Sequence, residues 1–333
     1  MDRTAAEKEW LRRISGGRPV VPQGKPTSGP ASDQASSKPT PKPQPTAKKH
    51  GNGFGDIAGM EDLKQRVKEG FINVLQHRDL ADAYGIRPPS MLFYGPAGCG
   101  KTFFAEKMAE EVGIHFVKVV PDDLASTMVH GTQEKIGEVF KNAERHAPAL
   151  LFFDEFDAMV PRRTGNEYNQ HYDSEVNEFL CMLNHASDKG VYVLAATNHP
   201  ERIDKAVLRT GRIDELVYVD MPDHEARKSL FALELAKLPR EEGIDMDRLA
   251  HLTQGYNCSD INYIVKSAAR KKFNEAIGCG EHTLQNITQK QLEEIISGRS
   301  PSVSSRDLRE YQRVHREFSP KDKGGQPASI GFR

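Results

Sequence analysis

A glycine-rich stretch of eight residues carries the clearest chemistry in this sequence. It matches the pattern of a phosphate-binding loop and reads Gly95, Pro96, Ala97, Gly98, Cys99, Gly100, Lys101 and Thr102. The apolar run at 91–94 before it predicts a strand, and the pattern from Phe103 onward predicts a helix. A strand, a glycine turn and a helix in this order point several backbone N–H groups at one spot, which suits a chain of phosphates. We therefore expect the chain to bind ATP or GTP with this loop and with Phe103, the residue that follows it.

Three side chains of this loop have chemistry of their own. The ammonium group of Lys101 is expected to reach the β- and γ-phosphates, and the hydroxyl group of Thr102 to bind Mg²⁺. Cys99 has two interpretations. It is either a thiol whose pKa is lowered at a helix N-terminus, so that it oxidises readily, or a small residue that simply fits the loop. The second is the interpretation that we favour.

A second apolar run, at 150–153, ends in two acidic residues, Asp154 and Glu155. A strand that ends in such a pair is common and by itself indicates little. After a phosphate-binding loop, however, the first acid is expected to help hold magnesium and the second to polarise the attacking water. We therefore assign Asp154 to the metal, together with Thr102, and Glu155 to catalysis.

A third apolar run, at 191–195, leads to Asn198. If this strand lies beside the other two, Asn198 would project toward the γ-phosphate and orient the water together with Glu155. The segment that follows carries Arg209 and Arg212. These arginines are either ordinary surface charges or the added cation that hydrolysis of this type often needs at the γ-phosphate.

The elements that must position these groups follow from the alternation of patterns along the chain. Between residues 54 and 220, helical patterns alternate with short, continuously apolar runs, which indicates a parallel sheet covered on both faces. After Pro222 the pattern is helical only. The predicted fold is therefore α/β, with a P-loop parallel sheet flanked by helices and a smaller all-helical domain. The predicted parts are a nucleotide-binding domain at 54–222, a helical lid domain at 223–299, and a C-terminal helix and tail at 300–333.

The first 53 residues differ in composition from the rest. From Ser15 to Gly53 they are rich in Pro, Gly, Ser, Lys and Thr and almost without large apolar side chains. Such a segment cannot bury enough apolar surface to offset the entropy of ordering it, so 1–53 is predicted to be a disordered tether. A short helix predicted at 5–14 is either a frayed terminus or a docking motif for a partner protein.

Composition narrows the expected partners and compartment. The net charge of −1 does not indicate a nucleic-acid-binding protein. Four cysteines without a CxxC pair argue against a zinc site and a disulfide framework, and they fit a reducing cytoplasm. No apolar run approaches the roughly 20 residues that span a bilayer. We expect a cytoplasmic protein without a membrane span.

Several motifs, taken together, resemble those of the classical AAA ATPases, part of the AAA+ group, from residue 54 to about residue 318. They are Phe54–Gly59, the phosphate-binding loop, Asp154–Asp157, Ala195–Pro200 and Asp204–Asp214. The segment at 300–311 is similar to a C-terminal helix found in the meiotic group (katanin, spastin, fidgetin and Vps4-like proteins) and in the second ring of Cdc48-like proteins. In those families that helix packs near a subunit contact.

The resemblance implies roles for further residues. Asn198 would be the sensor-1 residue, and Arg209 and Arg212 would be arginine fingers that reach the neighbouring subunit's site. The active form would then be a homo-oligomeric ring, normally a hexamer. Ser259 stands in the small-domain signature near the nucleotide, where Cys258 and Ser259 replace the usual Gly-Ala. Four residues would line the adenine pocket: Asp56, Ile57, Ala58 and Gly59.

One loop departs from the family pattern. Family members that unfold proteins place an aromatic residue on a loop facing the central pore, and Val129 stands there in this chain, beside His130. Aromatic side chains offer rigid contact area for gripping an extended peptide. A second loop, at 162–173, is either an ordinary exposed loop or a basic and aromatic pore loop.

Three functions therefore stay open. The leading one is an ATP-hydrolysing ring that remodels, unfolds or disassembles a protein partner recruited by residues 1–53. The alternatives are a nucleotide-controlled switch or scaffold that threads nothing, which the missing pore aromatic favours, and a motor acting on nucleic acid, which the net charge discourages.

Overall fold

The computed structural model describes residues 51–124, 131–162, 179–208, 211–278 and 284–318. All of these residues belong to one unit of the chain, Thr46–Arg333. Several predictions lie outside the described residues. They concern the tether up to residue 50 with its helix at 5–14, the loop with Val129 and His130, the loop at 163–173, and Arg209.

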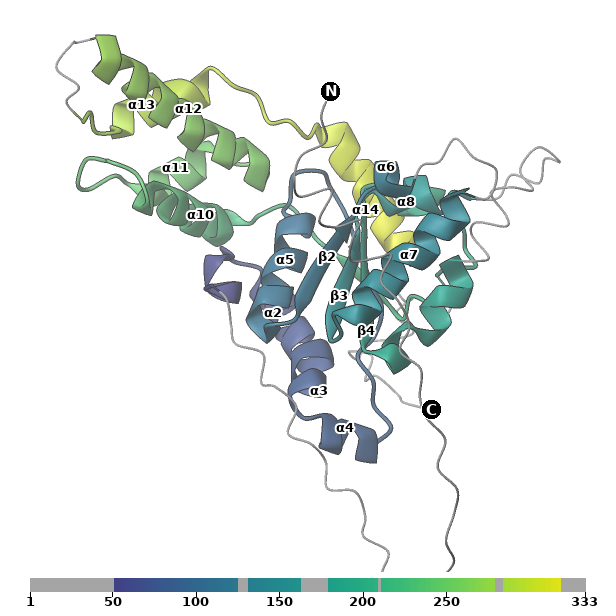
Figure 1. Cartoon of the computed structure of the whole chain (residues 1–333). Coiled ribbons are helices and arrows are strands. Elements are labelled where there is room, and N and C mark those ends of the chain that lie inside the picture. Colours follow the sequence, from purple (N-terminus) through teal and green to yellow (C-terminus); the bar gives the residue numbers. More distant parts are fainter. Residues whose placement is uncertain (1–50, 125–130, 163–178, 209–210, 279–283, 319–333) are drawn as a thin grey trace, which may run out of the picture. The chain divides into compact units, whose positions relative to one another are not determined.

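Five parallel strands form one sheet in the described part of the chain (Figure 1). They are β1 (Met91–Tyr94), β2 (His115–Val119), β3 (Ala149–Phe153), β4 (Val191–Thr197) and β5 (Glu215–Tyr218). The strand order is β2-β3-β4-β1-β5, and every neighbouring pair is parallel. The predicted parallel sheet is confirmed, and β4 lies between β3 and β1.

Helices alternate with these strands as the sequence predicts. They are α2 (Glu61–Val67), α3 (Asn73–Gln76), α4 (Arg78–Ala83), α5 (Lys101–Val112), α6 (Pro121–Leu124), α7 (Gly131–Arg145) and α8 (Phe156–Met159). Residues 179–186 are also helical. A π-helical turn at Lys68–Ile72 joins α2 to α3, and short 3-10 turns lie at Gly53–Asp56, Ser187–Lys189 and Pro200–Arg202.

Alternate residues of the strands enter two different hydrophobic cores. In β3, Leu151 packs in a core that includes Phe140 of α7, whereas Leu150 packs in a core that includes Phe104 of α5. Figure 1 shows α5 and α7 on opposite sides of the sheet. A strand that is apolar at every position is stable where both of its faces are covered. All of β3 is accordingly buried.

The chain after residue 222 is helical, as predicted. Its helices are α10 (His224–Ala236), α11 (Met246–Leu252), α12 (Cys258–Gly278) and α13 (Gln289–Ser297). They share a core of their own in which Phe231 and Leu249 are fully buried. Side chains that accept backbone N–H groups cap α10 and α11, namely Asp223 and Asp245. The exact domain boundaries at 222 and 299 stay predictions.

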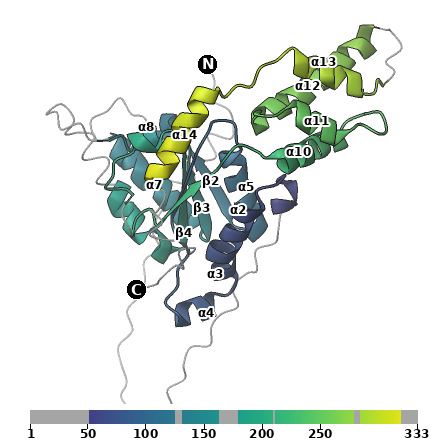
Figure 2. The same ribbon diagram turned by 180° about the vertical axis from the view of Figure 1, so that it is seen from behind.

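The last helix, α14 (Ser305–Phe318), returns to the sheet (Figure 2). The Nδ1 atom of His315 lies 2.8 Å from the hydroxyl oxygen of Tyr94, at the end of β1. The His315 ring also stacks on Tyr218 of β5, with ring centroids 4.2 Å apart. The C-terminal helix therefore packs at the end of β1, which leads into the predicted phosphate-binding loop, and at the end of β5. Among the described residues, no helix is long and apolar enough to cross a membrane.

Candidate nucleotide-binding site

The predicted site residues meet at the carboxyl ends of three neighbouring strands. Tyr94, the last residue of β1, pairs with Thr197 of β4, and Phe153, the last residue of β3, pairs with Ala195 of β4. The phosphate-binding loop, the acidic pair and Asn198 follow these strand ends directly. In open parallel sheets, this edge is where ligands bind.

The phosphate-binding loop is held by the helical part of the chain. The backbone N–H of Ser259 donates to the carbonyl oxygen of Gly98 over 3.0 Å. Gly98 has a φ of +75°, and a Cβ atom there would lie 2.4 Å from Nδ2 of Asn257. Only glycine fits such a position without strain. The first turn of α12 therefore lies in direct contact with the loop.

Lys101 begins α5 and is almost fully buried. Its Nζ atom donates to the carbonyl oxygens of Gly95, over 2.9 Å, and Pro96, over 2.8 Å. Burial lowers the pKa of Lys101 to about 8, although the neighbouring Cys99 and Asp154 oppose this shift. An anionic phosphate chain at the loop would favour the charged ammonium form and give it better partners than two carbonyls.

The two residues predicted to hold magnesium are in contact. The hydroxyl group of Thr102 donates to Oδ2 of Asp154 over 3.0 Å. Hydroxyl and carboxylate oxygens are hard ligands of the kind that Mg²⁺ prefers, so this pair fits the predicted ion. The sequence did not predict a third group at this site, Lys118 of β2. Its Nζ atom lies 2.9 Å from the same Asp154 oxygen. The one signal for it in the sequence is a basic residue in an otherwise apolar run.

Glu155 occupies an unusual backbone conformation. Its φ is +50°, and Met60 is the other non-glycine residue of the described chain with a positive φ. Residues other than glycine rarely adopt this backbone conformation, and such strain concentrates at functional sites. The backbone N–H of Glu155 donates to Oδ1 of Asp154 over 3.1 Å, and the Glu155 side chain is exposed. A carboxylate placed this way is accessible to water beside the predicted metal site.

Asn198 lies half-buried directly after β4. The residues on either side of it, Thr197 and His199, make hydrogen bonds that the sequence did not predict. The Thr197 hydroxyl donates to Oδ1 of Asp157 over 2.5 Å, and the backbone N–H of His199 donates to the Thr197 hydroxyl over 2.8 Å. Asp157 comes from α8, directly after Glu155 and Phe156. The acidic segment and the end of β4 are thereby tied together.

In the described part of its own chain, Arg212 bonds to the segment just before it. Its Nη1 atom donates to the carbonyl oxygen of Ala206 over 2.7 Å. The role of Arg212 at a neighbouring subunit's site stays a prediction, as does that of Arg209.

A cavity of about 210 Å³ adjoins the loop and is bordered by the start of α12. Eight residues that the sequence assigns to nucleotide binding line it: Asp56, Ile57, Ala58, Gly98, Cys99, Gly100, Phe103 and Ser259. Eight further residues, which the sequence did not assign to nucleotide binding, add mainly apolar surface: Met60, Phe104, Pro222, Ala226, Leu230, Glu234, Cys258 and Asn262. Gly59 is not among the lining residues. It packs against Ala226 instead.

Asp56 is held in place by α5. Its carboxylate lies 2.7 Å from Nζ of Lys107 and accepts a hydrogen bond from Nδ2 of Asn52 over 3.0 Å. Hydrogen bonds first from Lys107 and then from Asn52 hold the pKa of Asp56 below its usual value. The Asp56 carboxylate thus bonds to side chains of the protein and holds this edge of the cavity in place.

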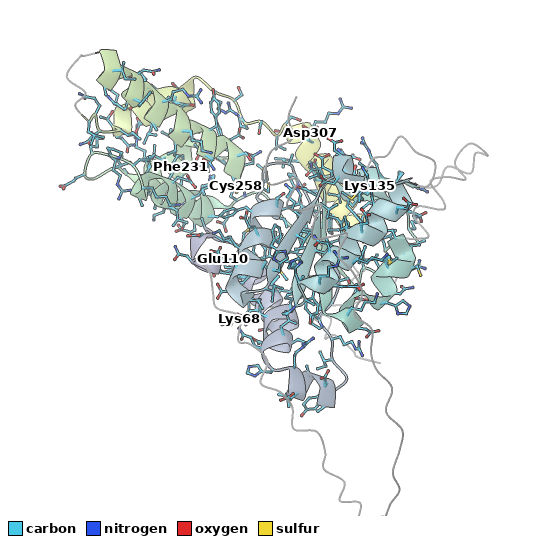
Figure 3. All side chains as sticks on the ribbon, viewed as in Figure 1. Lys68, Glu110, Lys135, Phe231, Cys258 and Asp307 are labelled. Atoms are coloured by element: carbon cyan, nitrogen blue, oxygen red, sulfur yellow. The ribbon has the colours of Figure 1, made fainter. Side chains whose placement is uncertain are left out.

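The interpretation of Cys99 as a readily oxidised thiol is wrong. The side chain is fully buried, with its sulfur atom 3.6 Å from that of Met221. Burial raises the pKa of Cys99 to about 12 and that of Cys258, labelled in Figure 3, to about 11. The thiolate form is the reactive one, so neither thiol is activated. Cys99 is therefore a small, buried residue of the loop itself.

Comparisons with known proteins point to one family. Residues 91–221 match the profile of the ATPase family associated with various cellular activities (AAA). The Cell division cycle protein 48 homolog of Archaeoglobus fulgidus is 33% identical over 273 residues, which are 79% of this chain and 37% of that protein. The Putative cell division cycle ATPase of Plasmodium falciparum is 32% identical over 241 residues, or 72% of this chain and 19% of that protein. The chain therefore spans well under half the length of these curated relatives.

Proposed function

The chain belongs to the AAA family of ATPases, and we propose that it binds ATP with Mg²⁺ at the phosphate-binding loop and hydrolyses it with Glu155. The observation that carries this proposal is the hydrogen bond between Thr102 and Asp154, directly beside the exposed Glu155 carboxylate. The predicted metal ligands Thr102 and Asp154 meet beside the phosphate-binding loop, and Glu155 follows Asp154 in the chain, which supports a γ-phosphate site there.

Binding uses groups that the chain already holds in place. The backbone N–H groups at the start of α5 receive the phosphates, and Lys101 exchanges its bonds to the carbonyls of Gly95 and Pro96 for bonds to phosphate oxygens. The adenine ring enters the mainly apolar cavity beside Ile57 and Ser259.

Hydrolysis needs an activated water and stabilisation of the charge on the γ-phosphate. When bound, Mg²⁺ supplies electrostatic stabilisation of the phosphate oxygens. Thr102 and Asp154 are the residues that would hold it. Glu155 polarises the attacking water, and Asn198 orients that water from the end of the neighbouring strand β4.

We further propose that the chain acts in a homo-oligomeric ring, a hexamer. In it Arg209 and Arg212 reach the neighbouring subunit's γ-phosphate, since hydrolysis of this type often requires an added cation. The contacts of Asn257 and Ser259 with the phosphate-binding loop offer a route by which nucleotide turnover moves the helical part. The ring would remodel or disassemble a cytoplasmic protein partner recruited by residues 1–53.

A second function is an ATP-controlled assembly switch or scaffold that threads no substrate. Val129, at the position where family unfoldases carry a pore aromatic, favours it.

The site is tested with a pair of variants. Glu155→Gln keeps the shape of the side chain but removes its charge, so we expect ATP binding to persist while turnover falls by about 10²-fold or more. Lys101→Ala should lose ATP binding. The measurements are binding of labelled ATP and release of phosphate. Turnover of Glu155→Gln close to that of the native protein would refute the assignment.

The same pair separates the two functions. Glu155→Gln should retain a protein partner in the presence of ATP, and Lys101→Ala should not. Release of that partner when Met128 and His130, the two residues that flank Val129, are changed would support remodelling through the pore. Equal retention by both variants, or release only on removal of residues 1–53, would support a switch or scaffold.

A further inference from the structure

A lysine from a neighbouring strand sits at the predicted metal-binding carboxylate. β2 and β3 pair in parallel, with Lys118 opposite Phe152, so Lys118 lies close to the end of β3 where Asp154 follows. Nζ of Lys118 is 2.9 Å from Oδ2 of Asp154. The same oxygen accepts the hydrogen bond from Thr102. One oxygen of Asp154 therefore contacts both the Thr102 hydroxyl and the Lys118 ammonium group.

This cation acts on nucleotide binding in two opposite directions. Without a metal ion, the ammonium group of Lys118 offsets the negative charge of Asp154, which would otherwise repel the phosphates. With a metal ion, the same positive charge repels Mg²⁺ and occupies part of the carboxylate that Mg²⁺ needs. The Lys118 side chain is 43% exposed, so water and salt screen both effects to a moderate size.

We propose that Lys118 sets how strongly nucleotide binding depends on Mg²⁺, by acting as a built-in counter-cation for Asp154. The inference rests on the proposed function, because it requires that nucleotide binds beside Thr102. It predicts a protein that binds nucleotide measurably without metal and needs more Mg²⁺ for full affinity than it would without this lysine.

The test measures the affinity of full-length protein for fluorescent N-methylanthraniloyl-ADP, first in EDTA and then across a Mg²⁺ titration. In Lys118→Met, we expect the Kd in EDTA to rise about threefold to tenfold. The Mg²⁺ concentration that gives half of the affinity gain should fall by a similar factor. These opposite changes identify an electrostatic role, because damage to the fold would weaken binding under both conditions.

Two further variants complete the test. Lys118→Arg keeps the charge and should retain the native Mg²⁺ dependence. Lys189→Met removes a matched pair, since Nζ of Lys189 lies 2.7 Å from Glu144 with similar exposure, and it should change neither quantity. A native Mg²⁺ curve in Lys118→Met would overturn the inference alone. Absence of binding by the native protein at saturating Mg²⁺ would overturn the proposed function as well.

Discussion

Asn257, the residue before α12, donates its side-chain amide to the carbonyl oxygen of Ala97 in the phosphate-binding loop over 3.0 Å. The same side chain accepts the backbone N–H of Asp260 over 2.8 Å and so caps α12. One buried residue therefore both starts a helix of the C-terminal part and holds the loop that binds phosphate. This link makes the stability of the helical part and the shape of the nucleotide site depend on each other.

Substitutions at Asn257 should separate these two roles. Asn257→Ala removes the cap and the loop contact, so we expect the free energy of unfolding to fall by about 1–3 kcal/mol and nucleotide affinity to fall with it. Asn257→Ser keeps a capping oxygen but is too short to reach Ala97. It should regain part of the stability, measured by urea unfolding, yet bind nucleotide as weakly as Asn257→Ala. Native affinity in Asn257→Ser would show that the loop contact is irrelevant to binding.

Gly59 should be far less tolerant of substitution than a glycine of the same conformation elsewhere. Its φ is +64°, and a Cβ atom there would lie 2.5 Å from Cβ of Ala226, which lines the cavity. Gly85 has a φ of +67° but open space around it. Both alanine variants bear the cost of a left-handed conformation, about 1–2 kcal/mol. In Gly59→Ala alone, overpacking should lower the free energy of unfolding by about a further 1–3 kcal/mol, measured by thermal unfolding. This variant should also bind nucleotide more weakly.

The backbone architecture was predictable because its signals are local. Continuously apolar runs such as 150–153, alternating with helical patterns, indicate a parallel sheet covered on both faces. The contact between Thr102 and Asp154 was also predictable, because a phosphate-binding loop and an acidic strand end have fixed roles in this chemistry. Each of these signals can be recognised in a short stretch of sequence, without knowing how distant segments pack.

The remaining contacts depend on packing between distant segments. Lys118 reaches Asp154 because β2 pairs with β3 in one particular register, which apolar runs do not reveal. Ala226 joins the cavity because α10 packs over Gly59. Cys99 was given two interpretations because a helix N-terminus lowers a thiol pKa whereas burial raises it. Complete burial decides between them.

Burial of Cys99 predicts a loss of stability at alkaline pH. The folded protein keeps the Cys99 proton up to about pH 12, whereas the unfolded chain releases it near pH 9. Between these values the unfolded state binds fewer protons, so the free energy of unfolding falls as the pH rises, by at most about 1.4 kcal/mol per pH unit. Between about pH 8 and pH 10.5, the free energy of unfolding of Cys99→Ala should therefore fall by about 1–2 kcal/mol less than that of the native protein. Parallel curves from urea unfolding would refute this prediction.

Arg212 is expected to act on the neighbouring subunit, since within its own chain its guanidinium donates to the carbonyl oxygen of Ala206. Arg212→Ala should lower ATP turnover by about 10³-fold while changing ATP affinity little, because the arginine acts on charge that develops in the transition state. Phosphate release and binding of labelled ATP are the two measurements. An equal loss of both quantities would contradict a transition-state role.

Mixing inactive subunits decides whether Arg212 works between chains. An Arg212→Ala subunit keeps its own Glu155, and a Glu155→Gln subunit keeps its Arg212. In a mixed ring, the first subunit's site can receive the arginine of the second, so an equimolar mixture should recover ATPase activity that neither variant shows alone. Recovery requires that Arg212 acts across the subunit boundary, because no single chain in the mixture holds both groups. A mixture as inactive as its components, in rings shown by native mass spectrometry to be mixed, would place the role of Arg212 within its own chain.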